Sequence, residues 1–190
     1  MRFADQFWVS DNTDPFDRLT IQEGYSCVYS PRAMACWVTD SPQSINQRAT
    51  TLKFRFHSAS MGVLGIGGNL NAWSESDLDA AAGMIRTYKE IRPIVQNGDL
   101  YRLHSPREGD VAAVQYVNRE RTESVLFAFL HSQRRGESRQ AIRLRGLDAA
   151  GLYRVEGTAG KRSGDGLMKS GLAVPLSGDF DSALIRIRKV

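Results

Sequence analysis

The sequence predicts an α/β segment followed by an all-β domain, because the pattern of its apolar residues changes once along the chain of 190 residues. Up to residue 97, short apolar runs alternate with stretches of helical periodicity, which is typical of successive βα units. From Gly98 onward, apolar and polar residues alternate with a period of two, and turn residues recur at intervals of about ten, as in an antiparallel β-sandwich. We therefore expect two domains, residues 1–97 and residues 98–190.

The first domain is too short for a complete barrel of βα units. Its expected elements are, in chain order, a strand at 7–9, a helix at 18–29, a strand at 33–38, a helix at 51–61 and a long helix beginning at Ser74. Pro15 stands where a proline fits the first turn of a helix. A closed TIM (β/α)8 barrel takes ~250 residues, or about 30 per unit, so this segment holds two or three units at most.

The long helix has the clearest local signals. Ser74 and Asp77 have the spacing of a capping box, in which a hydroxyl and a carboxylate bond to the first helical turn. Pro93 and then Asn97 are expected to end the helix. Apolar residues recur between these limits at helical spacing, at Leu78, Ala81, Ala82, Ile85 and Tyr88.

The second domain is expected to contain six to eight strands. Residues 124–130 are apolar on both faces, as in a central strand, whereas Ile142 and Leu144, like Ile185 and Ile187, alternate with arginines. Turns are predicted at residues 108–110, 135–137, 156–157, 163–166 and 177–179, where glycines stand among charged or polar residues.

Composition places the chain among soluble globular proteins, with 42% hydrophobic and 24% charged residues. No apolar run reaches the ~18 residues of a membrane span, and residues 1–14 do not form a signal peptide, so we expect a cytoplasmic protein without membrane contact. The net charge of +4 could indicate nucleic-acid binding. Because Arg143 and Arg145 alternate with apolar residues, we interpret the arginines as a solvated strand face instead.

The glycine-rich segment, two tryptophans, the cysteines and the histidines could suggest binding sites, but we interpret each of them as structural. Residues 65–69 resemble a glycine-rich phosphate loop, but no Gly-Lys-Ser/Thr follows, so we expect a tight turn. Trp37 and Trp73 could stack on a sugar, but we favour aromatic core. Cys27 and Cys36 lack metal-binding spacing and are expected to be reduced core thiols. The three histidines are scattered, so no metal site is expected.

Three carboxylates follow the first expected strand, at Asp11, Asp14 and Asp17. In a barrel, catalytic groups lie at the carboxyl ends of strands. A calcium loop is excluded, because Pro15 and Gln22 occupy ligand positions and the required glycine is missing. Spacing alone leaves a second interpretation open, in which Asp14 caps the helix and Asp17 pairs with an arginine, without any catalytic role.

The same stretch resembles a known family. Residues 8–24 are similar to the pattern W-[TV]-S-D-N-T-D-x-x-D-R-L-x-I-Q-x-G of the α-galactosidases of glycoside hydrolase family 36. The likeness continues through residues 31–70, the end of the long helix and residues 96–103 and 127–132. The resemblance implies the last two or three βα units of a TIM barrel followed by a C-terminal antiparallel β-sandwich.

The resemblance also implies a reaction, which is retaining hydrolysis of terminal α-galactosyl residues of raffinose- or melibiose-type substrates. Asp11 would be the acid/base residue and contact the substrate, and Trp8 would contribute more weakly to substrate binding. Asp14, Asp17 and Arg18 would support the site. No cofactor, metal or nucleic acid is implied, and homo-oligomer formation is compatible with the full-length enzyme.

Parts of the family pattern have no counterpart in the 190 residues. The K-x-D strand that carries the nucleophile and the glycine-rich C-S-G-G-G strand are both missing. We therefore expect a fragment that is inactive alone. The alternative hypothesis is a non-catalytic carbohydrate-binding or oligomerisation module built on the β-sandwich.

Overall fold

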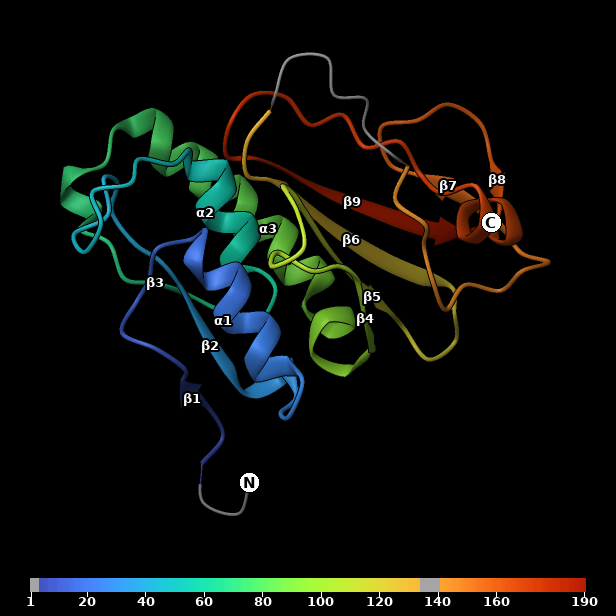
Figure 1. The fold of residues 1–190 in the computed structure, drawn as a ribbon, viewed down its shortest axis with the longest axis horizontal. Helices are drawn as coiled ribbons and strands as arrows, with labels where there is room; N and C mark the ends of the chain where they lie inside the picture. The colour runs from blue at the N-terminus through green and yellow to red at the C-terminus, as the bar shows by residue number, and fades with distance from the viewer. Residues whose placement is uncertain (1–3, 134–140) are drawn as a thin grey trace. The chain divides into compact units, whose positions relative to one another are not determined.

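The computed structural model describes residues 4–133 and 141–190, and the chain forms two compact units, Met1–Gln96 and Asn97–Val190. Figure 1 shows helices and a small sheet in the first unit, and long antiparallel strands in the second unit. The predicted order of a parallel βα segment followed by an antiparallel β domain is confirmed.

The first unit is built on a parallel sheet with the strand order β1-β2-β3. The strands are β1 (Phe7–Trp8), β2 (Met34–Val38) and β3 (Val63–Ile66), and the α-helices are α1 (Asp17–Ser26), α2 (Leu52–Ala59) and α3 (Glu75–Asn97). Two short 3-10 helices, η1 (Pro31–Ala33) and η2 (Leu70–Ala72), precede β2 and α3. In Figure 1, α1 and α2 lie over β2, as the βα pattern predicts.

Strand β3 corrects the expectation of a tight turn over residues 65–69. Gly65 lies within the strand, paired with Trp37 of β2, and only Gly67 to Asn69 lie in the bend that follows. The strand is difficult to recognise in the sequence, because Gly65 and Gly67 interrupt the apolar pattern on which a strand prediction depends.

Helix α3 confirms the predicted cap and the predicted end at Asn97, whereas Pro93 does not end the helix as expected. Ser74 Oγ accepts a hydrogen bond from Asp77 N at 3.1 Å and donates one to Asp77 Oδ2 at 2.8 Å. Pro93 lies inside the helix, which continues to Asn97. Pro93 removes one backbone hydrogen bond. Burial of Ile94 and Val95 holds the last turn in place regardless.

The core of this unit is centred on β2. Met34, Cys36 and Val38 pack against Phe56 of α2 and Ala81 of α3. Burial raises the pKa of the Cys36 thiol to about 11, although Arg18 beside it acts in the opposite direction. The expectation of two core thiols is wrong for the other cysteine, because Cys27 is exposed at the end of α1; both cysteines are free.

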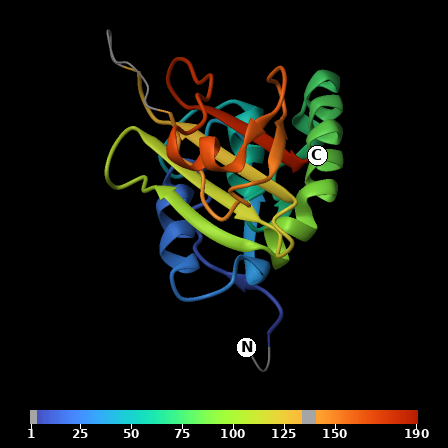
Figure 2. The ribbon, with the colours of Figure 1, turned by 90° about the vertical axis from the view of Figure 1, so that its right-hand side faces the viewer.

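The second unit contains a six-stranded sheet in the order β4-β5-β6-β9-β7-β8. Its strands are β4 (Asp99–His104), β5 (Val111–Val117), β6 (Glu123–Leu130), β7 (Leu152–Val155), β8 (Arg162–Ser163) and β9 (Asp181–Lys189). All its strand pairs are antiparallel. Figure 2 shows this sheet from a direction at right angles to Figure 1.

Two predictions in this unit need correction, and a third lies outside the described residues. The expected turn at residues 163–166 is instead the start of helix α4 (Gly164–Lys169), because Ser163 Oγ caps it by accepting from Gly166 N at 3.1 Å. The alternating residues around Ile142 form only an isolated bridge with Leu172. The expected turn at 135–137 falls in the segment that the structure does not describe.

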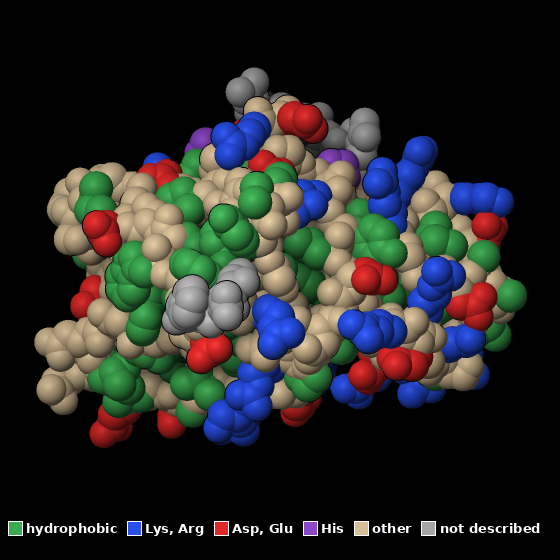
Figure 3. All heavy atoms as spheres, turned by 90° about the horizontal axis from the view of Figure 1, so that it is seen from below, with side chains coloured by type: hydrophobic (Ala, Val, Ile, Leu, Met, Phe, Trp, Pro, Cys, Tyr) green, Lys and Arg blue, Asp and Glu red, His purple; other side chains and the backbone are tan. Residues whose placement is uncertain are grey.

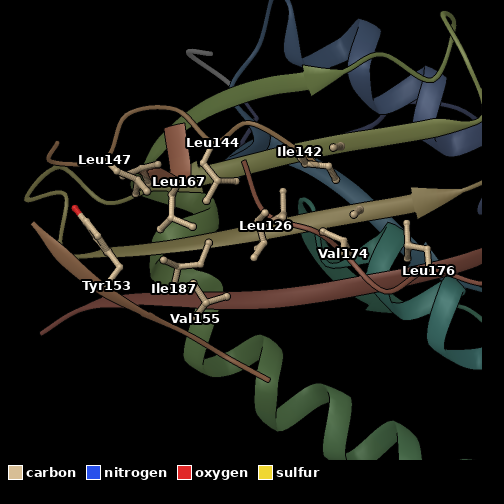
Figure 4. Close-up of a cluster of buried hydrophobic side chains, with 14 of the residues drawn as sticks. Leu126, Ile142, Leu144, Leu147, Tyr153, Val155, Leu167, Val174, Leu176 and Ile187 are labelled. Carbon is tan, nitrogen blue, oxygen red and sulfur yellow. The ribbon is translucent and has the colours of Figure 1, made fainter. Parts of the chain in front are cut away.

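A hydrophobic cluster joins one face of this sheet to the layer that covers it. Figure 4 shows Leu126, Val155 and Ile187 of the strands facing side chains from the covering segments, among them Ile142, Leu144, Leu167 and Leu176. Over the described residues, this covering layer consists of α4 and extended segments rather than a regular hydrogen-bonded sheet.

Candidate functional site

Polar residues follow all three parallel strands at the carboxyl edge of the sheet. Asp11 comes after β1, Asp40 directly after Thr39 at the end of β2, and Asn69 after β3. The strands are adjacent and parallel, so these loops lie at one edge. In a βα architecture this edge is where functional side chains gather.

Asp14 and Asp17 are both held by one arginine. Asp14 is completely buried, and its Oδ1 accepts hydrogen bonds from the backbone N of Phe16 at 3.1 Å and of Asp17 at 2.8 Å. Arg48 Nη1 forms an ion pair with Asp14 and another with Asp17 Oδ1 at 3.0 Å. Asp14 therefore caps the start of α1, and both carboxylates serve to attach the loop of Arg48.

The hydrogen bonds around Asp17 decide its ionisation. Burial raises the pKa of this carboxyl, but bonds from Asn12 Nδ2, at 2.9 Å, and from Arg48 outweigh burial and bring the pKa below its usual value. Asp17 is therefore a fixed anion near neutral pH, which suits an ion pair and not a proton donor.

Arg18 braces the helices against the sheet. It is buried, and its Nη2 donates to the carbonyl of Ala35 at 2.9 Å. Its Nε donates to Gln22 Oε1 at 3.3 Å, and Gln22 Nε2 donates in turn to the carbonyl of Ser58 at 3.1 Å. These bonds connect α1 with β2 and α2, so Arg18 contributes to packing behind the edge.

Asp11 differs from the other two aspartates of its loop. Its side chain is exposed and forms no hydrogen bond or ion pair with any of the residues that the structure describes. Trp8, at the end of β1, is 56% exposed and packs against Trp37 with ring centroids 4.9 Å apart. Trp37 is thus half-buried between Trp8 and Gly65 rather than in the core.

A second arrangement at this edge was missed in the sequence. Asp40 accepts hydrogen bonds from Asn69 N, at 3.1 and 3.0 Å, and from Trp73 Nε1 at 3.0 Å. The bond from Trp73 is the main reason that the pKa of Asp40 is lowered. The guanidinium of Arg55 lies 5.8 Å from the centre of the Trp73 ring. The available signal was the position of Asp40 after an apolar strand, which matches that of Asp11.

These residues line a pocket of about 190 Å³, which we call the Asp40 pocket. Asp40 and Ser41 come from the loop after β2, Arg55 from α2, Ala72 and Trp73 from η2 and its end, and Asp77 from α3. A Cβ on Gly68 would lie 2.6 Å from Asp40 Oδ1 and 3.2 Å from the Trp73 ring, so only glycine fits there without displacement. The pocket therefore depends on Gly68, which belongs to the glycine-rich segment that resembles a phosphate loop. Asp40 accepts hydrogen bonds from the backbone N–H of Asn69, which is the kind of group that a phosphate loop offers to an anion.

The second unit carries a charged hollow of about 200 Å³ lined by Arg154, Glu156, Arg186 and Arg188. Arg186 Nη2 pairs with Glu156 Oε1 at 2.8 Å, and Arg188 Nε pairs with Glu123 Oε1 at 3.1 Å. Figure 3 shows basic and acidic side chains next to each other on one face of the molecule. Such intermixed charge is typical of a solvated surface.

Within residues 4–133 and 141–190, no group of three or more histidine, cysteine, aspartate or glutamate side chains is arranged to hold a metal ion. None of the helices in this described part combines the length and apolar character that crossing a membrane requires.

Comparisons with known proteins match both units. The Melibiase family model matches residues 1–98, and the model of the glycosyl hydrolase family 36 C-terminal domain matches residues 111–187. Alpha-galactosidase 2 of Hypocrea jecorina is 34% identical over 190 residues, which are 100% of this chain and 25% of that protein.

Solved structures agree with these matches. The family 36 α-galactosidase AgaB of Geobacillus stearothermophilus superposes with a TM-score of 0.94 at 38% identity, over 97% of this chain and 26% of that one. A variant of AgaA from the same organism, solved in complex with raffinose, gives 0.94 at 36% identity, with 97% and 26% covered. The chain thus spans about a quarter of the length of the relatives it matches.

Proposed function

Because this chain belongs to glycoside hydrolase family 36 and corresponds to the C-terminal portion of its α-galactosidases, we propose that its first unit supplies Asp11 as the acid/base residue of a retaining α-galactosidase. The nucleophile would come from outside residues 1–190, since no Lys-x-Asp sequence is present in them. The substrate would be an α-galactoside of the raffinose class, because a related structure contains raffinose.

The observation that carries this proposal is the different state of the three aspartates in the loop after β1. Asp14 and Asp17 are both bonded to Arg48, whereas Asp11 is exposed and has no partner among the described residues. A group that gives and takes a proton in each cycle cannot also be held in a permanent ion pair. Asp11 is the one carboxylate of the loop that meets this condition.

Retention of configuration requires two carboxyl groups ~5–5.5 Å apart. In the first step Asp11 protonates the glycosidic oxygen while the nucleophile attacks the anomeric carbon, and the aglycone leaves. In the second step the Asp11 carboxylate takes a proton from water, which attacks the galactosyl-enzyme and releases galactose. Asp11 alone can neither form the covalent intermediate nor position the sugar, so we expect no turnover by the isolated chain.

A chimera tests this proposal, in which the chain replaces the corresponding C-terminal quarter of AgaB. Asp11→Asn should lower raffinose turnover by about 10²–10⁴-fold, the usual value of general acid–base catalysis. The rate of galactosylation by an aryl α-galactoside with a good leaving group should fall much less, because that leaving group departs without protonation. Asp5→Asn, an exposed aspartate of the same unit, is the matched control.

Equal losses in the galactosylation rate with both substrates, or no loss in Asp11→Asn, would contradict the acid/base assignment. The alternative function, a carbohydrate-binding or oligomerisation module, predicts galactose binding by the second unit in calorimetry. That measurement is independent of Asp11.

A further inference from the structure

We infer that the Asp40 pocket binds one neutral sugar ring of the oligosaccharide, separate from the galactosyl unit that is cleaved at Asp11. This inference rests on the proposed function, since it assumes that an oligosaccharide lies along the carboxyl edge of the sheet. The pocket is formed by the loops after β2 and β3, and Asp11 is in the loop after β1, their neighbour in the same sheet.

The side chains of the pocket offer the two kinds of contact that a sugar ring needs. Trp73 provides an aromatic ring, which packs against the apolar face of a pyranose. Asp77 accepts a hydrogen bond from Ser74 Oγ through Oδ2, and no bond to its Oδ1 is formed by the described residues. This oxygen is available to accept from a hydroxyl group of a sugar.

Trp73 is held in place before any ligand arrives. Its indole N–H is bonded to Asp40 at 3.0 Å, Arg55 lies over its ring, and Gly68 allows the close approach. Arg55 is itself attached to the carbonyl of Thr39 through Nη1 at 2.6 Å. A ring whose orientation is already determined loses little conformational freedom on binding, which favours weak, specific contacts.

Charge and size argue against anions, metal ions and drug-sized ligands. Two carboxylates and one guanidinium line the pocket, so an anion would be repelled, and the two carboxylates alone do not make a metal site. The volume of about 190 Å³ is below the roughly 300–1,000 Å³ of sites for drug-sized ligands. A single ring with hydroxyl groups is therefore the ligand that fits.

Ligand-observed saturation-transfer NMR on the intact chain tests the inference, with raffinose as the probe at micromolar protein. We expect saturable binding that becomes about five- to tenfold weaker in Asp77→Asn, the effect of replacing a charged hydrogen-bond acceptor by a neutral one. Asp79→Asn, on the same helix and also exposed, should bind like the wild type. Trp73→Ala should abolish binding, and Trp73→Phe should restore part of it.

Circular dichroism of each variant establishes that the fold is retained. Absence of binding by the wild type, or equal affinities of Asp77→Asn and Asp79→Asn, would overturn the inference. Neither result depends on Asp11, whose role is tested by turnover of the chimera. Failure of the pocket and failure of the acid/base assignment are therefore distinguishable.

Discussion

A Cβ atom on Gly65 would lie 2.6 Å from the ring of Trp37, its direct partner across the β2–β3 pair. The glycine is therefore required by packing, because its own backbone conformation would accept any side chain. Trp37 in turn packs against Trp8 of β1, so this contact connects all three strands.

Gly65→Ala should lower the free energy of unfolding by about 1–3 kcal/mol, the usual cost of an added methyl group in a filled site. Gly67→Ala is the matched control, because its Cβ would find ordinary contacts at 3.6 Å. Urea denaturation measures both variants. In a Trp37→Leu background the cost of Gly65→Ala should shrink, and an unchanged cost would show that the ring is not its cause.

Arg48→Gln should destabilise the first unit by about 3 kcal/mol, because it leaves the buried carboxylate of Asp14 without its charge partner. Arg32→Gln, an exposed arginine of the same unit, should change stability by less than about 0.5 kcal/mol. Denaturant midpoints at neutral pH measure the stability losses of the two variants. A loss as small as that of the control would mean that the backbone bonds of Asp14 suffice.

The bond from Trp73 that lowers the pKa of Asp40 also predicts a pH dependence. A carboxyl with a folded-state pKa below its usual 3.8 stabilises the native state above that pH, and this stability is lost as pH falls through the lower, folded value. The unfolding free energy should thus fall below pH 3.8 more steeply in the wild type than in Asp40→Asn. Asp79→Asn should keep the wild-type slope in the same acid titration.

The isolated chain should associate with itself through β1. This strand is at the edge of the sheet, and its side chains are exposed, Phe7 to 38% and Trp8 to 56%. Two further apolar side chains, Val28 and Tyr29, are exposed just after the end of α1. An open apolar edge strand promotes aggregation, so we expect the folded chain to form oligomers. Trp8→Lys should reduce the mass seen by light scattering, whereas Val190→Lys, an equally exposed apolar position, should not. A monomer with one cooperative thermal transition would refute this expectation.

Local sequence signals predicted most elements of the fold. The cap from Ser74 to Asp77 and the strand through residues 124–130 were found because each depends on neighbours within one element. The misses have a common cause in packing. Strand β3 contains a glycine that the Trp37 ring requires, α3 continues past Pro93 because its last turn is buried, and Ser163 caps a helix where glycines suggested a turn.

The sequence by itself determined that Asp11, Asp14 and Asp17 follow a strand, since strand periodicity and motif spacing are local properties. It also left two interpretations of these residues open. Only the tertiary structure showed that Asp14 and Asp17 share Arg48 as a partner, because this arginine is 34 and 31 residues away from them along the chain. The Asp40 pocket likewise needs Trp73, which is 33 residues from Asp40. Contacts at such separations follow from how βα units stack side by side, which no local pattern encodes.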